Sequence, residues 1–316
     1  MVGYLLTVLI LISLNFFLPR TMPGDPLSAL QDQSSQAYVP DSGTRSALGR
    51  YYGLDRPLWA QYRRYIADLA KADLGTSVRY RRPVANLVAE RLPWSVLLGG
   101  TAMAMAVAVG LWAGIHSGWR RDRAIDRGLL TIFIGLRNFP VFLLASFALF
   151  FFSAKLGWFP IAGAETPFAT LGPLGRVADV ARHLVLPATV LAVQFIGGHY
   201  LVMRAAMVEE LGADYLLLGR AKGLGDRRLK YRYAARNALL PVVTLTALEL
   251  GFIVTGAVFV ERVFAYPGMG QLLFDAVSAR DYPAIQGCFL IITLGVVSLN
   301  FLAEALYRRL DPRTAA

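Results

Sequence analysis

Six long apolar stretches constrain this 316-residue chain more than any other feature of its sequence. A helix of roughly 20 apolar residues crosses the hydrocarbon layer of a bilayer, which is about 30 Å thick. Only 17% of the residues are charged, whereas soluble domains contain about a quarter. The sequence therefore predicts an all-α polytopic membrane protein with six transmembrane helices. These cover residues 2–18, 94–115, 128–153, 184–203, 238–260 and 284–306.

The basic residues between these stretches predict an orientation. Segment 119–127 carries four arginines, segment 204–237 carries eight Lys or Arg, and the tail 307–316 carries three arginines. Short cytoplasmic loops are enriched in Lys and Arg, so we expect all three segments, and both termini, to be cytoplasmic. The net charge of +11 follows from these loops and not from one basic soluble domain, which argues against a nucleic-acid partner.

This orientation divides the chain into parts. Residues 1–18 form the first helix, 19–93 an external segment, 94–306 a five-helix core containing the cytoplasmic loop 204–237, and 307–316 the tail. The external segment contains an amphipathic stretch whose apolar residues recur at helical spacing. They are Leu58, Tyr62, Tyr65, Ile66 and Leu69. Two interpretations stay open: a helical cap packed on the membrane helices, or a lip that meets an external partner.

The loop 204–237 contains residues that begin and end helices. Asp214 is expected to cap a helix that begins at Tyr215, because its carboxylate can accept a free N–H of the first turn. Gly223 can end that helix in the left-handed conformation. Asp226 is expected to cap a second helix that continues through Arg236 into the fifth apolar stretch. The loop is therefore predicted to be a helix–turn–helix element; the alternative is a solvated charged loop.

The same loop resembles the cytoplasmic coupling loop of ABC importer permeases, in which a glycine precedes a Leu-Pro pair; here these are Gly223 and Leu240-Pro241. "DYLLLGRAKGL" and "RNALLP" resemble the dipeptide/oligopeptide/nickel family in particular. Gly219 departs from this family, which usually has Ala there. Further matches follow in order over nearly the whole chain. They are "PGDP" at Pro23, "GLDRPLWAQY" at Gly53, "DLGTS" at Asp73, "KLGWFP" at Lys155, "HLVLPA" at His183, "VFAYPGMG" at Val263, "RDYPAIQG" at Arg280 and "LDPR" at Leu310.

This resemblance implies a type I ABC importer permease fold in a bacterial or archaeal cytoplasmic (inner) membrane. Two homologous permease subunits would form the pore, two ATPase subunits would bind their coupling loops, and an external substrate-binding protein would deliver a peptide, nickel complex, glutathione or related solute. The chain has no G-x-x-x-x-G-K-[ST] loop, so we expect ATP and magnesium on the ATPase partners and no cofactor here. The residues expected to carry coupling are Arg220, Ala221, Lys222, Gly223 and Leu224, with Asp214 and Asp226 as caps.

Two ionisable residues fall inside predicted spans: Arg137 in the third and Glu249 in the fifth. At about 1.5 Å per residue they lie roughly 14 Å and 17 Å from the cytoplasmic ends. Ionisable groups at such depth usually face a bundle interior or a water-filled cavity. We therefore hypothesise that the two residues pair or that both line the translocation path. The alternative for Arg137 is that its side chain extends to the membrane interface.

Other polar residues within the spans favour structural roles. Asn15, Gln194, His199 and Asn300 are expected to form hydrogen bonds between helices, and Gly110 and Gly114 to permit close helix packing. The chain shows no paired intramembrane carboxylates, no metal-ligand spacing and no nucleophile with a base, so we expect neither a catalytic site nor a metal site. A stand-alone channel or secondary transporter is the rival function; it would need no ATPase.

Overall fold

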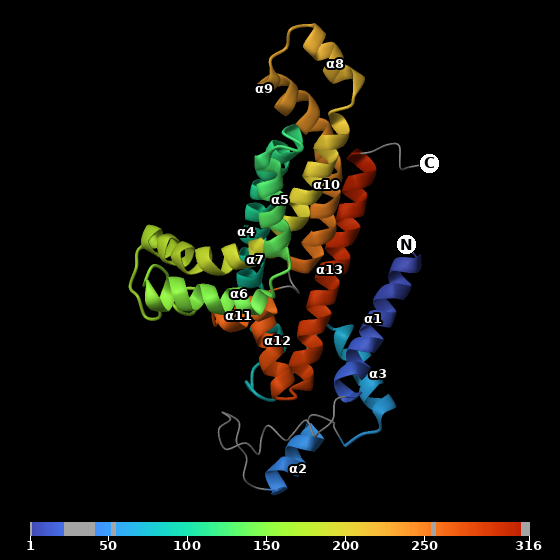
Figure 1. Ribbon diagram of the computed structural model, residues 1–316. Coiled ribbons are helices and arrows are strands. Elements are labelled where there is room, and N and C mark those ends of the chain that lie inside the picture. The colour runs from blue at the N-terminus through green and yellow to red at the C-terminus, as the bar shows by residue number, and fades with distance from the viewer. Residues whose placement is uncertain (1, 22–41, 52–54, 254–256, 311–316) are drawn as a thin grey trace. The chain divides into compact units, whose positions relative to one another are not determined.

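The computed structural model describes residues 2–21, 42–51, 55–253 and 257–310 (Figure 1). Within these residues every regular element is helical, apart from an isolated bridge between Thr76 and Pro83. The chain divides into two compact units. The first comprises Met1–Ser95 with Pro267–Gly295, and the second comprises Val96–Tyr266 with Val296–Ala316. The predicted all-α class is confirmed for the described residues.

The first unit is built around α1 (Val2–Thr21) and α3 (Leu58–Leu69). It also contains α2 (Ser42–Tyr51), α12 (Met269–Ser278), the beginning of α4 (Val84–Trp119) and the beginning of α13 (Tyr282–Leu310). Phe16 of α1 packs against Tyr62 and Tyr65 of α3, with ring centroids 5.2 and 5.4 Å apart. Asn15 donates a hydrogen bond to the carbonyl of Gln286 in α13, 2.8 Å away. The amphipathic helix thus lays its aromatic residues on α1, as the cap interpretation expects.

Asp281 joins two sequence motifs of the first unit that are about 200 residues apart in the chain. Its buried carboxylate accepts hydrogen bonds from the Ser77 hydroxyl at 2.5 Å and from the Arg79 N–H at 3.0 Å. The other carboxylate oxygen accepts the Ala284 N–H at 3.2 Å, within the first turn of α13. One aspartate therefore caps α13 and fixes the turn that precedes α4.

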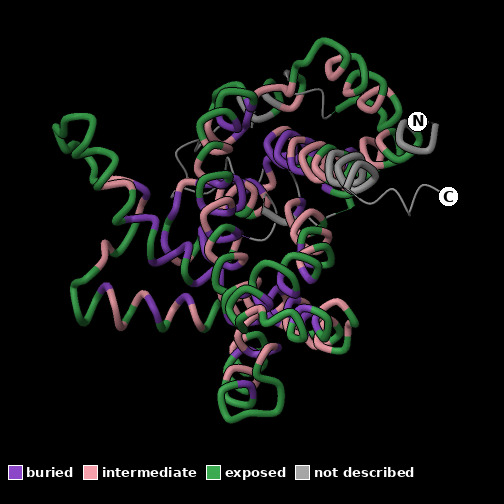
Figure 2. The backbone as a smooth tube through the Cα atoms, turned by 90° about the horizontal axis from the view of Figure 1, so that it is seen from above, coloured by how far each residue is buried: buried purple, intermediate pink, exposed green. Residues whose placement is uncertain are grey.

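The second unit is a bundle in which α5 (Ala124–Arg137), α7 (Pro173–Glu210) and α10 (Ala235–Glu249) lie beside the remainder of α4 (Figure 1). α6 (Val141–Ala148) continues as a π-helical segment η2 (Leu149–Lys155). At one end of the bundle are α8 (Asp214–Ala221), α9 (Asp226–Arg228) and the π-helical segment η3 (Leu229–Ala234). The 3₁₀ segment η4 (Leu250–Ile253) and α11 (Val258–Val263) follow α10. Exposed residues gather at helix ends and outer faces (Figure 2).

A stripe of glycines brings α4 and α7 into close contact. Three glycines four residues apart on α4 face three residues four apart on α7: Gly110 faces His199, Gly114 faces Met203 and Gly118 faces Met207. A Cβ atom added to Gly110 or Gly114 would lie 2.6 Å from the opposing Cβ atom. Such small residues let helix backbones approach closely. The packing predicted for Gly110 and Gly114 is confirmed, and Gly118 extends it.

Among the described residues, three helices are long and apolar enough to cross a membrane: α4, α7 and the Tyr282–Phe301 portion of α13. Counting a bent pair as one span gives four. The prediction of one continuous helix over residues 128–153 is wrong. α5 ends at Arg137, α6 begins at Val141, and the two are bent by 97°. Pro140 explains the break, because proline lacks an N–H and disfavours helical geometry in the preceding residue.

The first predicted span, residues 2–18, lies within one helix, α1 (Val2–Thr21), whereas the fifth predicted span is not one regular α-helix. α10 ends at Glu249 and passes into the 3₁₀ segment, so residues 238–260 are not one α-helix. Residues 254–256, within this predicted span, lie outside the described residues. Glu249 is therefore the last residue of α10, where the helical run changes from α to 3₁₀ geometry.

The glycine stripe leads to a stability prediction. Replacing Gly114 with alanine places a methyl group 2.6 Å from Met203 Cβ and 3.0 Å from the Arg204 backbone nitrogen. Overpacking against backbone costs about 1–3 kcal/mol, so Gly114→Ala should lower the thermal unfolding temperature of the purified protein in detergent. Gly100→Ala, on the same helix and with no atom within 4 Å, is the control and should be neutral or stabilising. Equal unfolding temperatures for the two variants would contradict the close packing.

Candidate functional site

The basic loop, residues 204–237, folds as a rigid helical element. α8 ends in a Schellman motif: the Gly223 N–H bonds to the Arg220 carbonyl at 2.9 Å, and the Leu224 N–H bonds to the Gly219 carbonyl at 3.1 Å. Gly223 has a φ of +75°, a conformation that favours glycine. The predicted stop at Gly223 is confirmed. A solvated, irregular loop is excluded.

The predicted capping roles of Asp214 and Asp226 are wrong. α8 begins at Asp214 itself and α9 at Asp226, so the N-cap positions belong to Ala213 and Gly225, neither of which makes a side-chain capping bond. Both aspartates instead occupy first turns, where a carboxylate is stabilised by the positive end of the helix dipole by about 0.3–1 kcal/mol. The second predicted helix is confirmed as one continuous helical run from α9 through η3 into α10.

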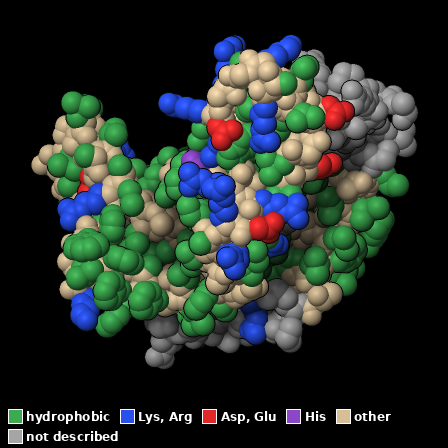
Figure 3. Space-filling model, turned by 45° about the horizontal axis from the view of Figure 1, so that its top comes forward, with side chains coloured by type: hydrophobic (Ala, Val, Ile, Leu, Met, Phe, Trp, Pro, Cys, Tyr) green, Lys and Arg blue, Asp and Glu red, His purple; other side chains and the backbone are tan. Residues whose placement is uncertain are grey.

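The residues predicted to carry coupling lie on the outer surface of this element. Arg220, Ala221, Lys222 and Gly223 are exposed, whereas Leu224 is half-buried. Two leucines that the sequence analysis did not select are also exposed: Leu217 at 70% and Leu218 at 55%. An exposed leucine pair flanked by cations is unusual for a solvated helix and is typical of an interaction surface. Figure 3 shows Lys and Arg scattered over this end of the molecule, with apolar side chains among them.

The inner side of the element is packed firmly onto the bundle. Leu216 and Leu229 are fully buried in a cluster with Met203 and Met207 of α7. A Cβ atom on Gly219 would lie 2.6 Å from Leu229 Cδ2, so the departure from the family's usual alanine makes room for this leucine. Lys230 is buried at the same place; burial, together with nearby Arg120, lowers the pKa of its ammonium group.

A buried ion pair holds the base of the basic loop. The Arg204 guanidinium binds both oxygens of Asp126 at 2.7 Å. Asp126 is 1% exposed and also accepts hydrogen bonds from the Ser117 hydroxyl and the Asp122 N–H. Ser117 in turn contacts the Tyr200 hydroxyl at 2.7 Å. This network joins α4, α5 and α7 where the loop begins. The sequence offered one signal for it, the two acidic residues Asp122 and Asp126 amid the arginines of segment 119–127.

Arg137 and Glu249 lie on either side of Gly197-Gly198 in α7. The Arg137 Cβ atom is 3.0 Å from the position of a Cβ on Gly197, and Glu249 Oε1 is 3.6 Å from one on Gly198. Arg137 is the last residue of α5 and Glu249 the last of α10. Within the part of the chain that the structure describes, no ion pair joins the two residues; the partner nearest to Glu249 Oε2 is His199 Nδ1 at 3.5 Å.

Two polar residues of α7 near Arg137 and Glu249 form the interhelical hydrogen bonds predicted for them. His199, which is fully buried, binds the Thr246 hydroxyl of α10 through Nε2 at 3.0 Å. Gln194 donates to the Phe139 carbonyl at 3.3 Å, across the break between α5 and α6. Both bonds tie α7 to the ends of neighbouring helices.

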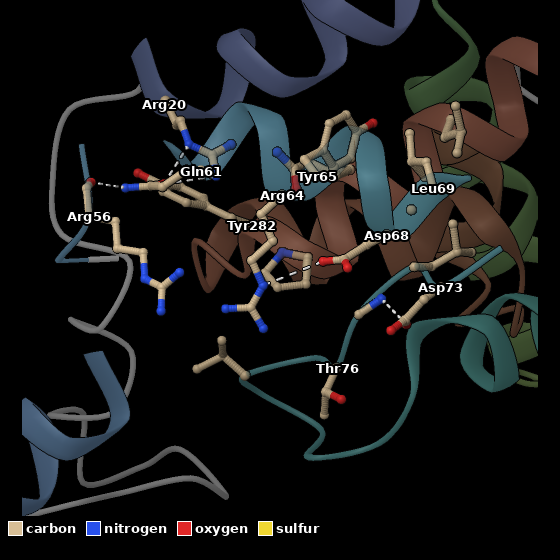
Figure 4. A pocket seen from close by; sticks show the side chains of 17 residues that line it. Arg20, Arg56, Gln61, Arg64, Tyr65, Asp68, Leu69, Asp73, Thr76 and Tyr282 are labelled. Carbon is tan, nitrogen blue, oxygen red and sulfur yellow. Dashed lines mark hydrogen bonds and ion pairs between the residues drawn. The ribbon is translucent and has the colours of Figure 1, made fainter. Parts of the chain in front are cut away.

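The first unit contains a pocket of about 300 Å³ (Figure 4). Its charged residues are Arg20, Arg56, Arg64, Asp68 and Asp73. Two of them have partners within the unit: Arg20 donates to Gln61 Oε1 and to the Phe16 carbonyl, and Arg64 Nε lies 3.6 Å from Asp68 Oδ2. Burial raises the pKa of the pocket's Tyr65 to about 12.

The long apolar helices among the described residues define a multi-pass membrane protein. The sequence profile of the family "Binding-protein-dependent transport system inner membrane component" matches residues 106–316, and the chain belongs to this family. It is 35% identical to the di/tripeptide transport system permease protein DppB of Pseudomonas aeruginosa (strain UCBPP-PA14), covering 95% of this chain and 92% of that protein. It is 34% identical to the glutathione transport system permease protein GsiC of Escherichia coli (strain K12), covering 99% and 96%. The resemblance stated from the motifs is thereby confirmed, and the chain is a non-catalytic permease subunit.

The ion pair at the base of the loop leads to the second prediction. Asp126→Asn removes the charge that neutralises Arg204 and should lower the free energy of unfolding by about 3 kcal/mol. Asp122→Asn is the matched control, because the Asp122 side chain is 81% exposed and its pair with Arg121 should contribute less than about 1 kcal/mol. Chemical denaturation in detergent, followed by tryptophan fluorescence, measures both. Similar losses for the two variants would contradict the structural role of the pair.

Proposed function

We propose that this permease forms half of the translocation pore of an ATP-driven importer and that α8 binds a groove on a separate ATPase subunit. The observation that carries the proposal is the exposed surface of α8. Leu217 and Leu218 offer an apolar contact, and Arg220 and Lys222 offer charge, on a helix whose opposite face is buried against α7. A rigid helix of this kind can transmit a push, because its inner face moves with the bundle.

The proposed assembly follows the family. It contains a second homologous permease, two ATPase subunits that hold ATP and magnesium, and an external substrate-binding protein. We propose six crossings of the lipid bilayer, with both termini and the basic loop cytoplasmic and residues 19–93 external. Two crossings would then be interrupted, at residues 138–140 and after Glu249. Broken helices of this kind are common where transporters handle their substrates.

A short peptide is the proposed substrate class. The two relatives named above are a di/tripeptide permease and a glutathione permease, and glutathione is itself a small peptide. Both align with nearly the full length of this chain, which supports a shared substrate class.

The helical stop at Gly223 provides the test of coupling. Gly223→Pro forces φ from +75° to about −65° and removes the N–H that binds the Arg220 carbonyl at 2.9 Å. Substrate-stimulated ATPase activity of the complex reconstituted with its ATPases and binding protein should fall at least ~10-fold, since the distortion costs ~3 kcal/mol. The protein should still insert into the membrane.

The matched control for this experiment is Gly225→Ala, in the same turn. Gly225 has a φ of −66° and no atom within 4 Å of an added Cβ, so ATPase activity should be retained. Unchanged activity in Gly223→Pro would overturn the proposed coupling. Failure of the wild-type permease to co-purify with any ATPase would favour a stand-alone channel or secondary transporter.

A further inference from the structure

The pocket of the first unit is lined by both cationic and anionic side chains. Its volume of about 300 Å³ lies at the lower end of the range that small-molecule sites occupy. Its wall is built from the end of α1, from α3, from the segment that precedes α4 and from the beginning of α13 (Figure 4). All of these belong to one compact unit, so the pocket is a feature of that unit alone.

Gln61 fixes two arginines of this pocket. Its Oε1 atom accepts hydrogen bonds from Arg20 Nε at 3.2 Å and Nη2 at 3.1 Å, and its Nε2 atom donates to the Arg56 carbonyl at 2.8 Å (Figure 4). Arg20 is also held by Phe16, whose carbonyl lies 2.8 Å from Nη1 and whose ring centroid lies 3.6 Å from Cζ. The Arg20 guanidinium and the Arg56 backbone are therefore in place before a ligand arrives.

The positive charge of these arginines is only partly neutralised by the described residues. The acceptors of Arg20 are neutral oxygens, and among the described residues Arg56 has no carboxylate within ion-pair distance. Arg64 Nε lies 3.6 Å from Asp68 Oδ2, which is longer than a hydrogen bond, so this contact leaves the guanidinium donors available. The guanidinium groups of Arg56 and Arg64 both extend away from Arg20 (Figure 4). Guanidinium groups bind a carboxylate through parallel hydrogen bonds.

The carboxylates of the pocket restrict which anion fits. Asp68 and Asp73 line the same cavity. They repel a doubly charged phosphate more strongly than a single carboxylate, and they attract an ammonium group on the same solute. A metal ion fits less well, because in the described part of the chain no group of three or more His, Cys, Asp or Glu side chains gathers at any point. The charges therefore favour a small solute that carries one carboxylate and one ammonium group.

The rest of the lining and the size of the pocket agree with a short peptide. The volume equals that of about ten water molecules, which leaves room for a solute of about ten non-hydrogen atoms, such as a dipeptide. Aromatic and aliphatic side chains line the pocket beside the charged groups and can contact small apolar side chains. They are Tyr65, Leu69, Leu74, Tyr282 and Leu290.

We propose that this pocket is a peptide-binding site on the external side of the permease, in which Arg56 and Arg64 bind the terminal carboxylate of a short peptide. This inference rests on the proposed function, from which it takes the substrate class and the external position of residues 19–93. The permease itself then selects for a free carboxylate, in addition to the selection that the binding protein exerts.

The test measures peptide binding by the permease–ATPase complex in nanodiscs, without the binding protein, so that only the complex discriminates. The probes are tritiated alanyl-alanine and its C-terminal amide. Wild type should bind the free dipeptide about 10-fold more tightly than the amide, as expected for loss of one charge-assisted hydrogen-bonded contact. Arg56→Gln and Arg64→Gln should each remove most of this preference. Inorganic phosphate at the same concentration should not displace the dipeptide.

The matched control is Arg63→Gln. Arg63 is exposed and directly precedes Arg64 on α3, but it does not line the pocket, so this variant should keep the full preference. Arg56→Lys retains the charge and should keep part of the preference. Equal binding of the two probes by wild type, displacement by phosphate, an undiminished preference in Arg56→Gln and Arg64→Gln, or an equal loss in Arg63→Gln would each overturn the site.

An acidic side chain of the external binding protein is the other source of a carboxylate. The affinity of the complex for the peptide-free binding protein separates the two sources. If Arg56→Gln weakens that affinity while the peptide preference stays as in wild type, the pocket receives the binding protein and the peptide site is overturned. Co-purification of the ATPase subunits is measured on the same preparations. If they are retained, failure of the peptide site leaves the proposed function standing; loss of ATPase association from wild type counts against the proposed function instead.

Discussion

The close contact between α4 and α7 is the constraint on which the second unit depends. Glycines 110, 114 and 118 remove side chains along one line of α4, so the α7 backbone can approach until its own residues fill the gap. α7 then presents its other faces to α5 and α10, which places Gly197-Gly198 opposite their ends. The same helix ends at Glu210, at the start of the α8 element, after Arg204 has bound Asp126. α7 thus connects Gly197-Gly198, beside Arg137 and Glu249, with the exposed surface of α8.

The parts that the sequence predicted correctly are those decided by local chemistry. Gly223 was identified as a stop because a positive φ is accessible to few residues other than glycine. Apolar length was sufficient to find α4, α7 and α13. The prediction that Asp214 and Asp226 are helix caps was wrong for an equally local reason. A helix start that moves by one residue turns a cap into a first-turn position, and the sequence locates helix ends only to within a few residues.

The parts that the sequence did not predict depend on tertiary contacts or on backbone breaks within apolar runs. Hydropathy averages over a window, so Pro140 did not interrupt the third apolar stretch although it interrupts the helix. The hydrogen bond from Ser77 to Asp281 joins two segments that are distant in the sequence and come together only when the chain folds. Arg137 and Glu249 were recognised as unusual by their charge, but their placement at helix ends beside two glycines could not be read from spacing, because it depends on where α5 and α10 stop.

The π-helical segment η3 has a consequence for the way motion passes from α8 into the bundle. A π turn accommodates one residue more than an α turn, so the helix that follows is rotated relative to the helix that precedes it. Leu229 lies against Gly219 of α8, and Val242, further along the same helical run, is buried in the same apolar cluster. Because η3 continues directly into α10, this π turn sets the angle at which a movement of α8 is passed to the rest of the bundle.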